Sequence, residues 1–189
     1  MLVLRWILCS CHSSIVGFSS NSHSSNAIKV FIDDYGSSNT AVGHRRWLLY
    51  SKASEFSFGS TNHAGVLSEF GDAVKFENTN IPDYIAYPPN GYIPQELVFE
   101  RWSFSIPAEN NQSADFSNAQ ISMSGPDGDI NLSVVSRTDN GYGDNTIVWE
   151  PEQIYDLMDN DVNFNITISN IGNVSPDTYS YTVKVFNPQ

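Results

Sequence analysis

The sequence predicts an α+β protein, in which a small helical part is followed by an all-β, immunoglobulin-like sandwich. Apolar residues recur at the helical spacing i, i+3, i+4 and i+7 over residues 26–35. From residue 102 onward, apolar and polar residues alternate in short runs with turn residues between them. The segment 84–94 holds three prolines and a glycine, which predicts a linker without regular structure. We therefore predict two domains, 1–88 and 92–189.

The first helix is predicted by its flanking residues as well as by its periodicity. Serine and asparagine precede it as N-cap residues, and Gly36 follows as a C-terminal stop. Asp33 and Asp34 fall in its last turn, where the helix dipole disfavours negative charge. These two carboxylates therefore require either solvent or a cationic partner. A second short helical piece is predicted over 41–49.

The β-rich part is predicted to hold roughly seven strands, since short alternating runs with turns between them are typical of a β-sandwich. The hairpin signal Pro126-Asp127-Gly128-Asp129 separates two of the runs. Two earlier strand candidates lie at 56–58 and 73–76. The predicted strands of the sandwich lie around 102–106, 119–123, 130–134, 146–149, 164–168 and 179–185.

The net charge and the composition of the chain argue against two classes of binding partner, nucleic acids and anionic membranes. The chain has 189 residues and a net charge of −12. This charge argues against nucleic acid, because phosphate binding needs a basic face, and against attachment to anionic lipid. No apolar run approaches the length of a transmembrane span. Cys9 and Cys11 are separated by one residue and are poorly placed for a disulfide bond.

The segment Gly43-His44-Arg45-Arg46-Trp47-Leu48-Leu49-Tyr50 places three imidazole or guanidinium groups beside an apolar run. Unpaired charges are costly to bury, so this segment predicts either a functional site or the wall of one. With the acidic helix end before it, the segment resembles the bacterial branch of the CAP superfamily (cysteine-rich secretory, antigen 5 and pathogenesis-related 1 proteins, or SCP domain). Residues 87–94, 102–105 and 141–149 resemble the β-rich tail that follows some bacterial CAP domains.

This resemblance implies an α-β-α sandwich with a cleft of two histidines and two acidic residues, which binds a divalent metal in some members. His44 matches the second family histidine. Asp34 falls at the place of the helix acid, with Asp33 as the less favoured choice. The first histidine and the other acid have no counterpart here. The resemblance therefore implies a partial, N-terminally truncated CAP-type α-β-α sandwich.

The candidate cleft residues are His44, Asp34 and Arg45. His44 and Asp34 are either a metal or general-base pair, with zinc or calcium as the cofactor, or a structural hydrogen bond at a helix end. We favour the structural alternative, because a zinc site needs three or four protein ligands. Arg45 and Arg46 either clamp an anionic ligand or neutralise Asp33 and Asp34, and we favour neutralisation.

Asp139 and Asp144 are candidate calcium ligands, because they flank a loop rich in Asp, Asn and Gly. The same residue types are also typical of β-turns, and we favour that interpretation.

Together these patterns predict a secreted or surface-exposed protein, extracellular or at the cell surface. We expect a binding, adhesion or accessory module without its own catalysis, which recognises an extracellular ligand or cell-surface component. The first alternative is a metal-dependent CAP-type hydrolase whose cleft uses His44 and Asp34. The second is a structural fragment with no assembled site.

Overall fold

The computed structural model describes residues 14–18, 24–53, 57–60, 64–68, 80–108, 113–139, 143–152 and 160–188. Within these ranges the protein is predominantly β, with twelve strands in three sheets and two α-helices of 10 and 6 residues. The predicted α+β class, with a partial CAP-type α-β-α sandwich at its start, is therefore wrong. The helical periodicity covers too few residues to place a helical layer on each side of a sheet. The strand predicted at 73–76 lies outside the described residues.

The helices α1 (Ser24–Asp33) and α2 (Gly43–Leu48) follow the first strand. A three-stranded antiparallel sheet has the order β1 (Ser14–Phe18), β3 (Ala64–Ser68) and β2 (Ser57–Ser60). A four-stranded antiparallel sheet has the order β4 (Ile85–Tyr87), β6 (Trp102–Ile106), β10 (Asn145–Pro151) and β9 (Leu132–Thr138). A five-stranded sheet has the order β5 (Gly91–Pro94), β12 (Tyr179–Phe186), β11 (Val162–Ser169), β7 (Gln120–Gly125) and β8 (Gly128–Asp129). A 3₁₀ turn, η1 (Gln95–Leu97), follows β5.

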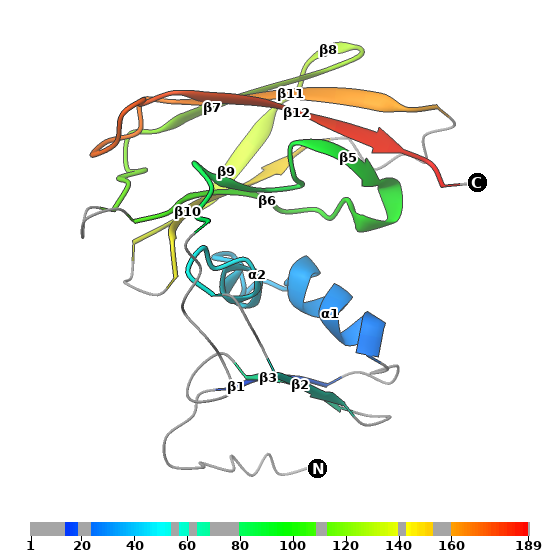
Figure 1. Ribbon diagram of the computed structural model, residues 1–189. Helices are drawn as coiled ribbons and strands as arrows, with labels where there is room; N and C mark the ends of the chain where they lie inside the picture. Colours follow the sequence, from blue (N-terminus) through cyan, green and yellow to red (C-terminus); the bar gives the residue numbers. More distant parts are fainter. Residues whose placement is uncertain are drawn as a thin grey trace.

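These elements stack in layers, as Figure 1 shows. The five-stranded sheet covers one face of the four-stranded sheet, and the two helices lie on its other side. Helix α1 also contacts all three strands of the small sheet. The helical layer therefore lies between two sheets, an arrangement that the sequence pattern did not predict.

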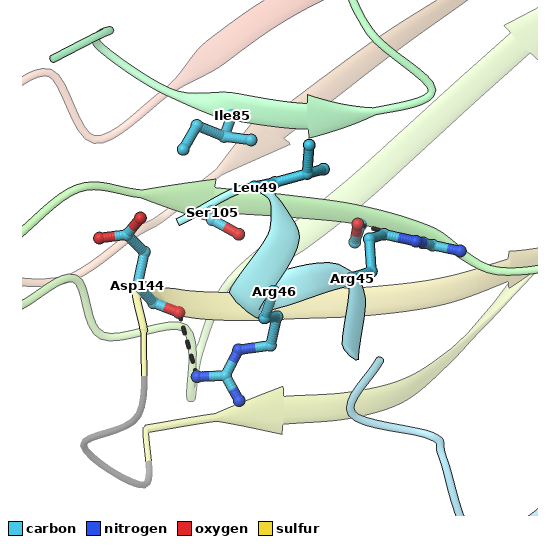
Figure 2. A pocket seen from close by; sticks show the side chains of 7 residues that line it. Arg45, Arg46, Leu49, Ile85, Ser105 and Asp144 are labelled. Atoms are coloured by element: carbon cyan, nitrogen blue, oxygen red, sulfur yellow. Dashed lines mark hydrogen bonds between the residues drawn. The ribbon is translucent and has the colours of Figure 1, made fainter. Parts of the chain in front are cut away.

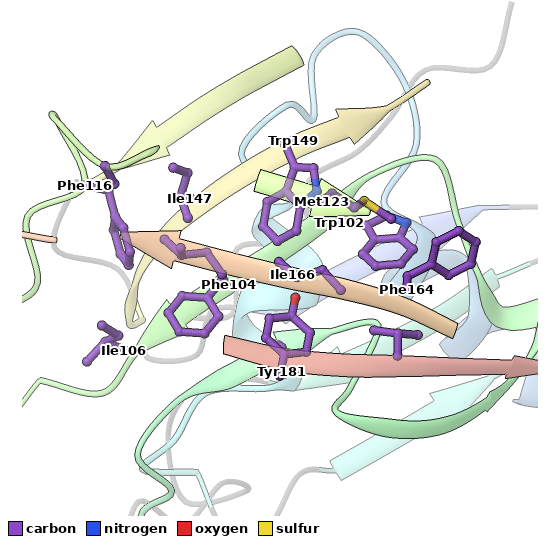
Figure 3. Close-up of a cluster of buried hydrophobic side chains, with 14 of the residues drawn as sticks. Trp102, Phe104, Ile106, Phe116, Met123, Ile147, Trp149, Phe164, Ile166 and Tyr181 are labelled. Atoms are coloured by element: carbon purple, nitrogen blue, oxygen red, sulfur yellow. The ribbon is translucent and has the colours of Figure 1, made fainter. Parts of the chain in front are cut away.

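The hydrophobic core fills the space between the four- and five-stranded sheets (Figure 3). In β11 and β12 the predicted alternation is confirmed, because every second side chain is buried in this core. The ring of Trp102 meets that of Phe164 edge-on, at 87° and a centroid distance of 5.8 Å. Ring quadrupoles favour this geometry. The buried residues of β11 and β12 are Phe164, Ile166, Ile168, Tyr181, Val183 and Val185.

Strand β6 is buried on both faces, although its alternating sequence predicts one face toward solvent. Trp102 and Phe104 belong to the core between the sheets. Ser103 lies on the opposite face, where its Oγ accepts a hydrogen bond from Arg45 Nη1 at 3.2 Å. The helical layer covers this second face, so the serines of β6 are buried as well.

The predicted linker at 84–94 contains two short strands, so the prediction of no regular structure there is wrong. Strand β4 pairs with β6, and β5 pairs with β12. Both strands lie at the edges of their sheets. A proline is tolerated at a sheet edge, because no neighbouring strand needs its missing N–H group. The division of the chain at 88–92 stays a prediction.

The hairpin predicted at 126–129 is confirmed, since Gly125 pairs with Gly128 and Ser124 with Asp129. The chain then leaves this sheet, because β9 pairs with β10 in the four-stranded sheet. The turn signal predicted the local reversal, but it carried no information about which sheet the next strand joins.

Replacing Tyr181 by phenylalanine is expected to stabilise the protein. Tyr181 Oη is buried and has no hydrogen-bond partner among the described residues. The Tyr181→Phe variant keeps the ring and removes this unpaired group, so the free energy of unfolding should rise by about 1 kcal/mol. Urea unfolding at neutral pH measures the change, and an unchanged or lower value would contradict the expectation.

The same variant should also alter the alkaline stability. Burial raises the pKa of Tyr181 above its ordinary value of 10.0. Because the folded-state pKa is the higher one, this tyrosine ionises first in the unfolded chain, so the free energy of unfolding of wild type falls as the pH rises above 10. Tyr181→Phe should therefore lose less stability than wild type above pH 10.

Candidate functional site

Asp34 caps the N-terminus of helix α2. The chain leaves α1 at this residue, which has a left-handed φ of 51°. Its Oδ2 accepts hydrogen bonds from the backbone N–H groups of His44 at 2.8 Å and Arg45 at 3.4 Å. Val42, the N-cap residue of α2, has an apolar side chain that cannot accept these hydrogen bonds. A carboxylate at this place satisfies orphan donors and complements the positive end of the helix dipole.

The predicted pair of His44 and Asp34 is brought together. His44 Nδ1 lies 2.6 Å from Asp34 Oδ1, and the imidazole stacks on Phe31 at a centroid distance of 5.5 Å. The His44 side chain is 36% exposed, whereas that of Asp34 is 0% exposed. A buried carboxylate in this position orients the imidazole and fixes which ring nitrogen faces it.

The same pair lacks further metal ligands in the part of the chain that the structure describes. There, no three His, Cys, Asp or Glu side chains lie close enough together to hold a metal ion. A zinc site takes three or four protein ligands. His44 and Asp34 thus supply at most part of such a site.

Arg45 is buried, with 1% of its surface exposed, and its guanidinium makes several hydrogen bonds. Its Nε and Nη2 donate to the carbonyl oxygens of Ile32 at 2.5 Å and Asp33 at 3.1 Å. These carbonyls belong to the last turn of α1, where no intrahelical donors remain. Its guanidinium also lies 4.6 Å from the ring centroid of Tyr87.

Arg45 and Arg101 together join α1 to the four-stranded sheet. Arg45 Nη1 donates to the carbonyl oxygen of Arg101 at 2.8 Å. Arg101 Nη1 in turn donates to the carbonyl oxygens of Asp34 at 3.3 Å and Gly36 at 2.8 Å, while its Nε donates to Glu150 Oε1 at 2.9 Å. Two guanidinium groups therefore satisfy the C-terminal end of one helix, where positive charge is favoured.

We call the contact that Arg45 and Arg101 make between the end of α1 and the four-stranded sheet the junction. Burial shifts the pKa values of two of its charged groups. Desolvation lowers the pKa of Arg45 to about 10, against opposing effects of Tyr87, Asp34 and Asp33. Desolvation also raises the pKa of Asp33, although Arg45 and Lys29 oppose the rise. Arg45 remains cationic at neutral pH, as its role beside the helix carboxyl end requires.

Arg46 extends in a different direction from Arg45, as Figure 2 shows. Its Nη2 donates to the carbonyl oxygen of Asp144 at 3.1 Å. The Asp144 carboxylate accepts hydrogen bonds from Ser51 N at 2.9 Å and Ser51 Oγ at 3.0 Å. Asp144, one of the two candidate calcium ligands, is thus buried against the segment after α2, while the other, Asp139, is exposed.

A small cavity lies beside Arg46 and Asp144 (Figure 2). Its free volume is about 10 Å³, which is room for about one water molecule. Its lining residues are Arg45, Arg46, Leu49, Ile85, Ser103, Ser105 and Asp144. The cavity is too small to hold an organic ligand of ordinary size.

Sequence reasoning missed three residues: Arg101 and Tyr87 at this junction, and Ser51 beside Asp144. Each lies far along the chain from its partners, and only Tyr87 falls in a segment that the resemblance covers, residues 87–94. The cationic Arg101 immediately before an apolar strand was the one available signal, because a charge beside a buried strand needs a partner.

No protein-family model matches this chain, and no curated protein matches it. The resemblance of the segment Gly43–Tyr50 to the CAP superfamily therefore stays a prediction. In the described part of the chain, no helix combines the length and the apolar character needed to cross a membrane.

Proposed function

We propose that this protein is an extracellular or cell-surface binding module, adhesive or accessory in role, without catalysis of its own. One observation supports this proposal: the candidate cleft residues use their polar groups for hydrogen bonds within the fold. Asp34 accepts two backbone N–H groups and contacts the imidazole of His44. The guanidinium of Arg45 donates to carbonyl oxygens of α1, to that of Arg101 and to Ser103 Oγ.

Groups that satisfy buried backbone atoms are poorly suited to bind or transform a substrate. A substrate that took the place of a helix carbonyl would leave that carbonyl unpaired, at a cost of about 1–3 kcal/mol. The junction therefore favours a structural role for His44, Asp34 and Arg45. The binding function would then belong to the exposed surface of the protein.

The location is proposed from composition and from the motif. The chain is acidic, with a net charge of −12, which disfavours nucleic acid and anionic membranes as partners. The resemblance of Gly43–Tyr50 to the bacterial CAP branch agrees with secretion, and it rests on the motif alone.

A metal-dependent hydrolase is the second candidate function, and one observation favours it. The His44 imidazole is 36% exposed and lies 2.6 Å from a buried carboxylate. This is the arrangement that prepares an imidazole as a general base or metal ligand. Further ligands would have to come from residues outside the described ranges or from a second chain.

Titration calorimetry with Zn²⁺ and Ca²⁺ on wild type and His44→Ala separates the two functions. The binding module should give no heat of specific metal binding in either protein. In parallel, fluorescently labelled protein should bind intact cells of the source organism saturably, and equally for both variants. Stoichiometric metal binding that His44→Ala abolishes would instead support the hydrolase, and cell binding lost in His44→Ala would contradict a structural role for this residue.

A further inference from the structure

The outer face of the five-stranded sheet is a regular surface that takes no part in the junction. Its inward positions fill the core, so the alternate positions of β7, β11 and β12 point away from it. In Figure 1 no other described element lies on this far side of the sheet. We call this surface the outer face; its side chains include Ser122, Asn165, Thr167, Ser180 and Thr182 and, on the edge strand β5, Tyr92.

Neutral hydrogen-bonding groups cover the outer face. Thr167 lies opposite Ser180, with their hydroxyl oxygens 2.8 Å apart. Thr182 Oγ1 donates to Asn165 Oδ1 at 2.9 Å in the neighbouring row. Each hydroxyl has one donor and two acceptor sites, so these pairs still offer hydrogen-bonding capacity to a ligand.

Carboxylates are absent from the described outward positions of β5, β7, β11 and β12, although the chain has 21 acidic residues. Asp129 lies beyond them on β8, at one edge of the sheet. Lys184 supplies a single positive charge near the other edge. The centre of the face is therefore uncharged within a strongly acidic protein.

Tyr92 provides an aromatic surface at the edge of this face. It is 68% exposed and lies opposite Lys184 in the parallel pairing of β5 with β12. Lys184 Nζ lies 5.0 Å from the centroid of its ring, and Phe186 meets it edge-on at 6.4 Å. These contacts hold the ring in position before a ligand arrives, which reduces the entropy lost on binding.

We infer that the outer face binds a neutral glycan, and this inference rests on the proposed binding function. A neutral sugar chain carries hydroxyl groups that both donate and accept, which matches the Ser, Thr and Asn side chains of the face. Its apolar C–H faces match the exposed ring of Tyr92. An uncharged partner also avoids the repulsion that an anion would meet from a chain of net charge −12.

Other partner classes fit this surface less well. Protein interfaces are depleted in serine and lysine and enriched in several aromatic residues, whereas this face offers mainly hydroxyl groups. Nucleic acids and anionic membranes need a basic surface, and Lys184 alone does not provide one.

Retention on neutral polysaccharides tests the inference. The full chain is incubated with insoluble cellulose, chitin and starch, and its mobility is measured in gels that contain soluble xylan or mannan. Wild type should be retained by at least one of these, with little dependence on salt. Tyr92→Ala should be retained about tenfold more weakly, as expected for loss of the aromatic contact to the sugar.

Tyr35→Ala is the matched control, because Tyr35 is 66% exposed and lies just after α1, away from the outer face. It should be retained as well as wild type. Immobilised heparin serves as the anionic comparison. Failure of wild type on every neutral polysaccharide, equal weakening in both variants, or retention on heparin alone would each overturn the inference. Cell binding that persists without polysaccharide retention would overturn the glycan and leave the proposed function standing.

Discussion

Arg45→Ala is expected to lower the free energy of unfolding by about 3–5 kcal/mol, because it removes a buried cation and leaves several carbonyl oxygens without their donor. The carbonyls of Ile32 and Asp33 lie in the last turn of helix α1, and that of Arg101 lies immediately before strand β6. Loss of this one side chain therefore loosens the helix end and its attachment to the sheet together. Chemical denaturation followed by circular dichroism measures the effect.

Arg137→Ala is the matched control for this experiment. Arg137 also donates to two backbone carbonyls, those of Phe116 and Ala119, but it is exposed to solvent. Water replaces its hydrogen bonds when it is removed, so the expected loss is about 1 kcal/mol. Equal losses in the two variants would show that burial of Arg45 does not matter, and would contradict its assigned role.

Phe104→Ala is expected to cost about 3–5 kcal/mol, the usual range for removing a fully buried phenylalanine. Phe104 is 0% exposed. Its ring packs against those of Tyr84, Phe116 and Tyr181, with centroid distances of 5.1, 6.3 and 6.1 Å. These neighbours come from separate segments, so they cannot all move in to fill the cavity. A urea titration monitored by tryptophan fluorescence measures the change.

Phe186→Ala supplies the comparison for the core variant, because Phe186 is only partly buried and lies on the outer face. It should lose less than half as much stability. Two separate unfolding transitions in Phe104→Ala, one early and one unchanged, would show that the helical layer unfolds independently of the sandwich. A single transition would show that the Arg45 junction makes them one cooperative unit.

The sequence predicted the elements whose partners are close in the chain or whose burial is one-sided. The alternation of β11 and β12 and the helix before Asp34 were of this kind, because periodicity reports directly which face is buried. Helix α1 spans Ser24–Asp33 where 26–35 was predicted, and its earlier C-terminal end follows from the left-handed backbone of Asp34. The proximity of His44 and Asp34 was also predicted, from the order of the motif.

The remainder depended on contacts between distant segments. Arg101 is 56 residues from Arg45, and Asp144 is 93 residues from Ser51. No local pattern encodes such pairs. The strands β4 and β5 were missed because their prolines and glycine argue against a central strand, but not against an edge strand. The predicted α-β-α sandwich was wrong because the two short helices match a CAP-like motif but do not form the helical layers of a CAP domain.

The parallel pairing of β5 with β12 has a mechanical consequence. Four residue pairs join these strands, from Gly91 with Val183 to Pro94 with Phe186. Tension applied to the segment before β5 and the segment after β12 pulls two parallel strands in opposite directions along their length. All of their hydrogen bonds then bear the force together in shear, whereas an antiparallel hairpin pulled at its two ends opens one pair at a time. The sandwich is thereby suited to keep its shape under tension applied through these two segments.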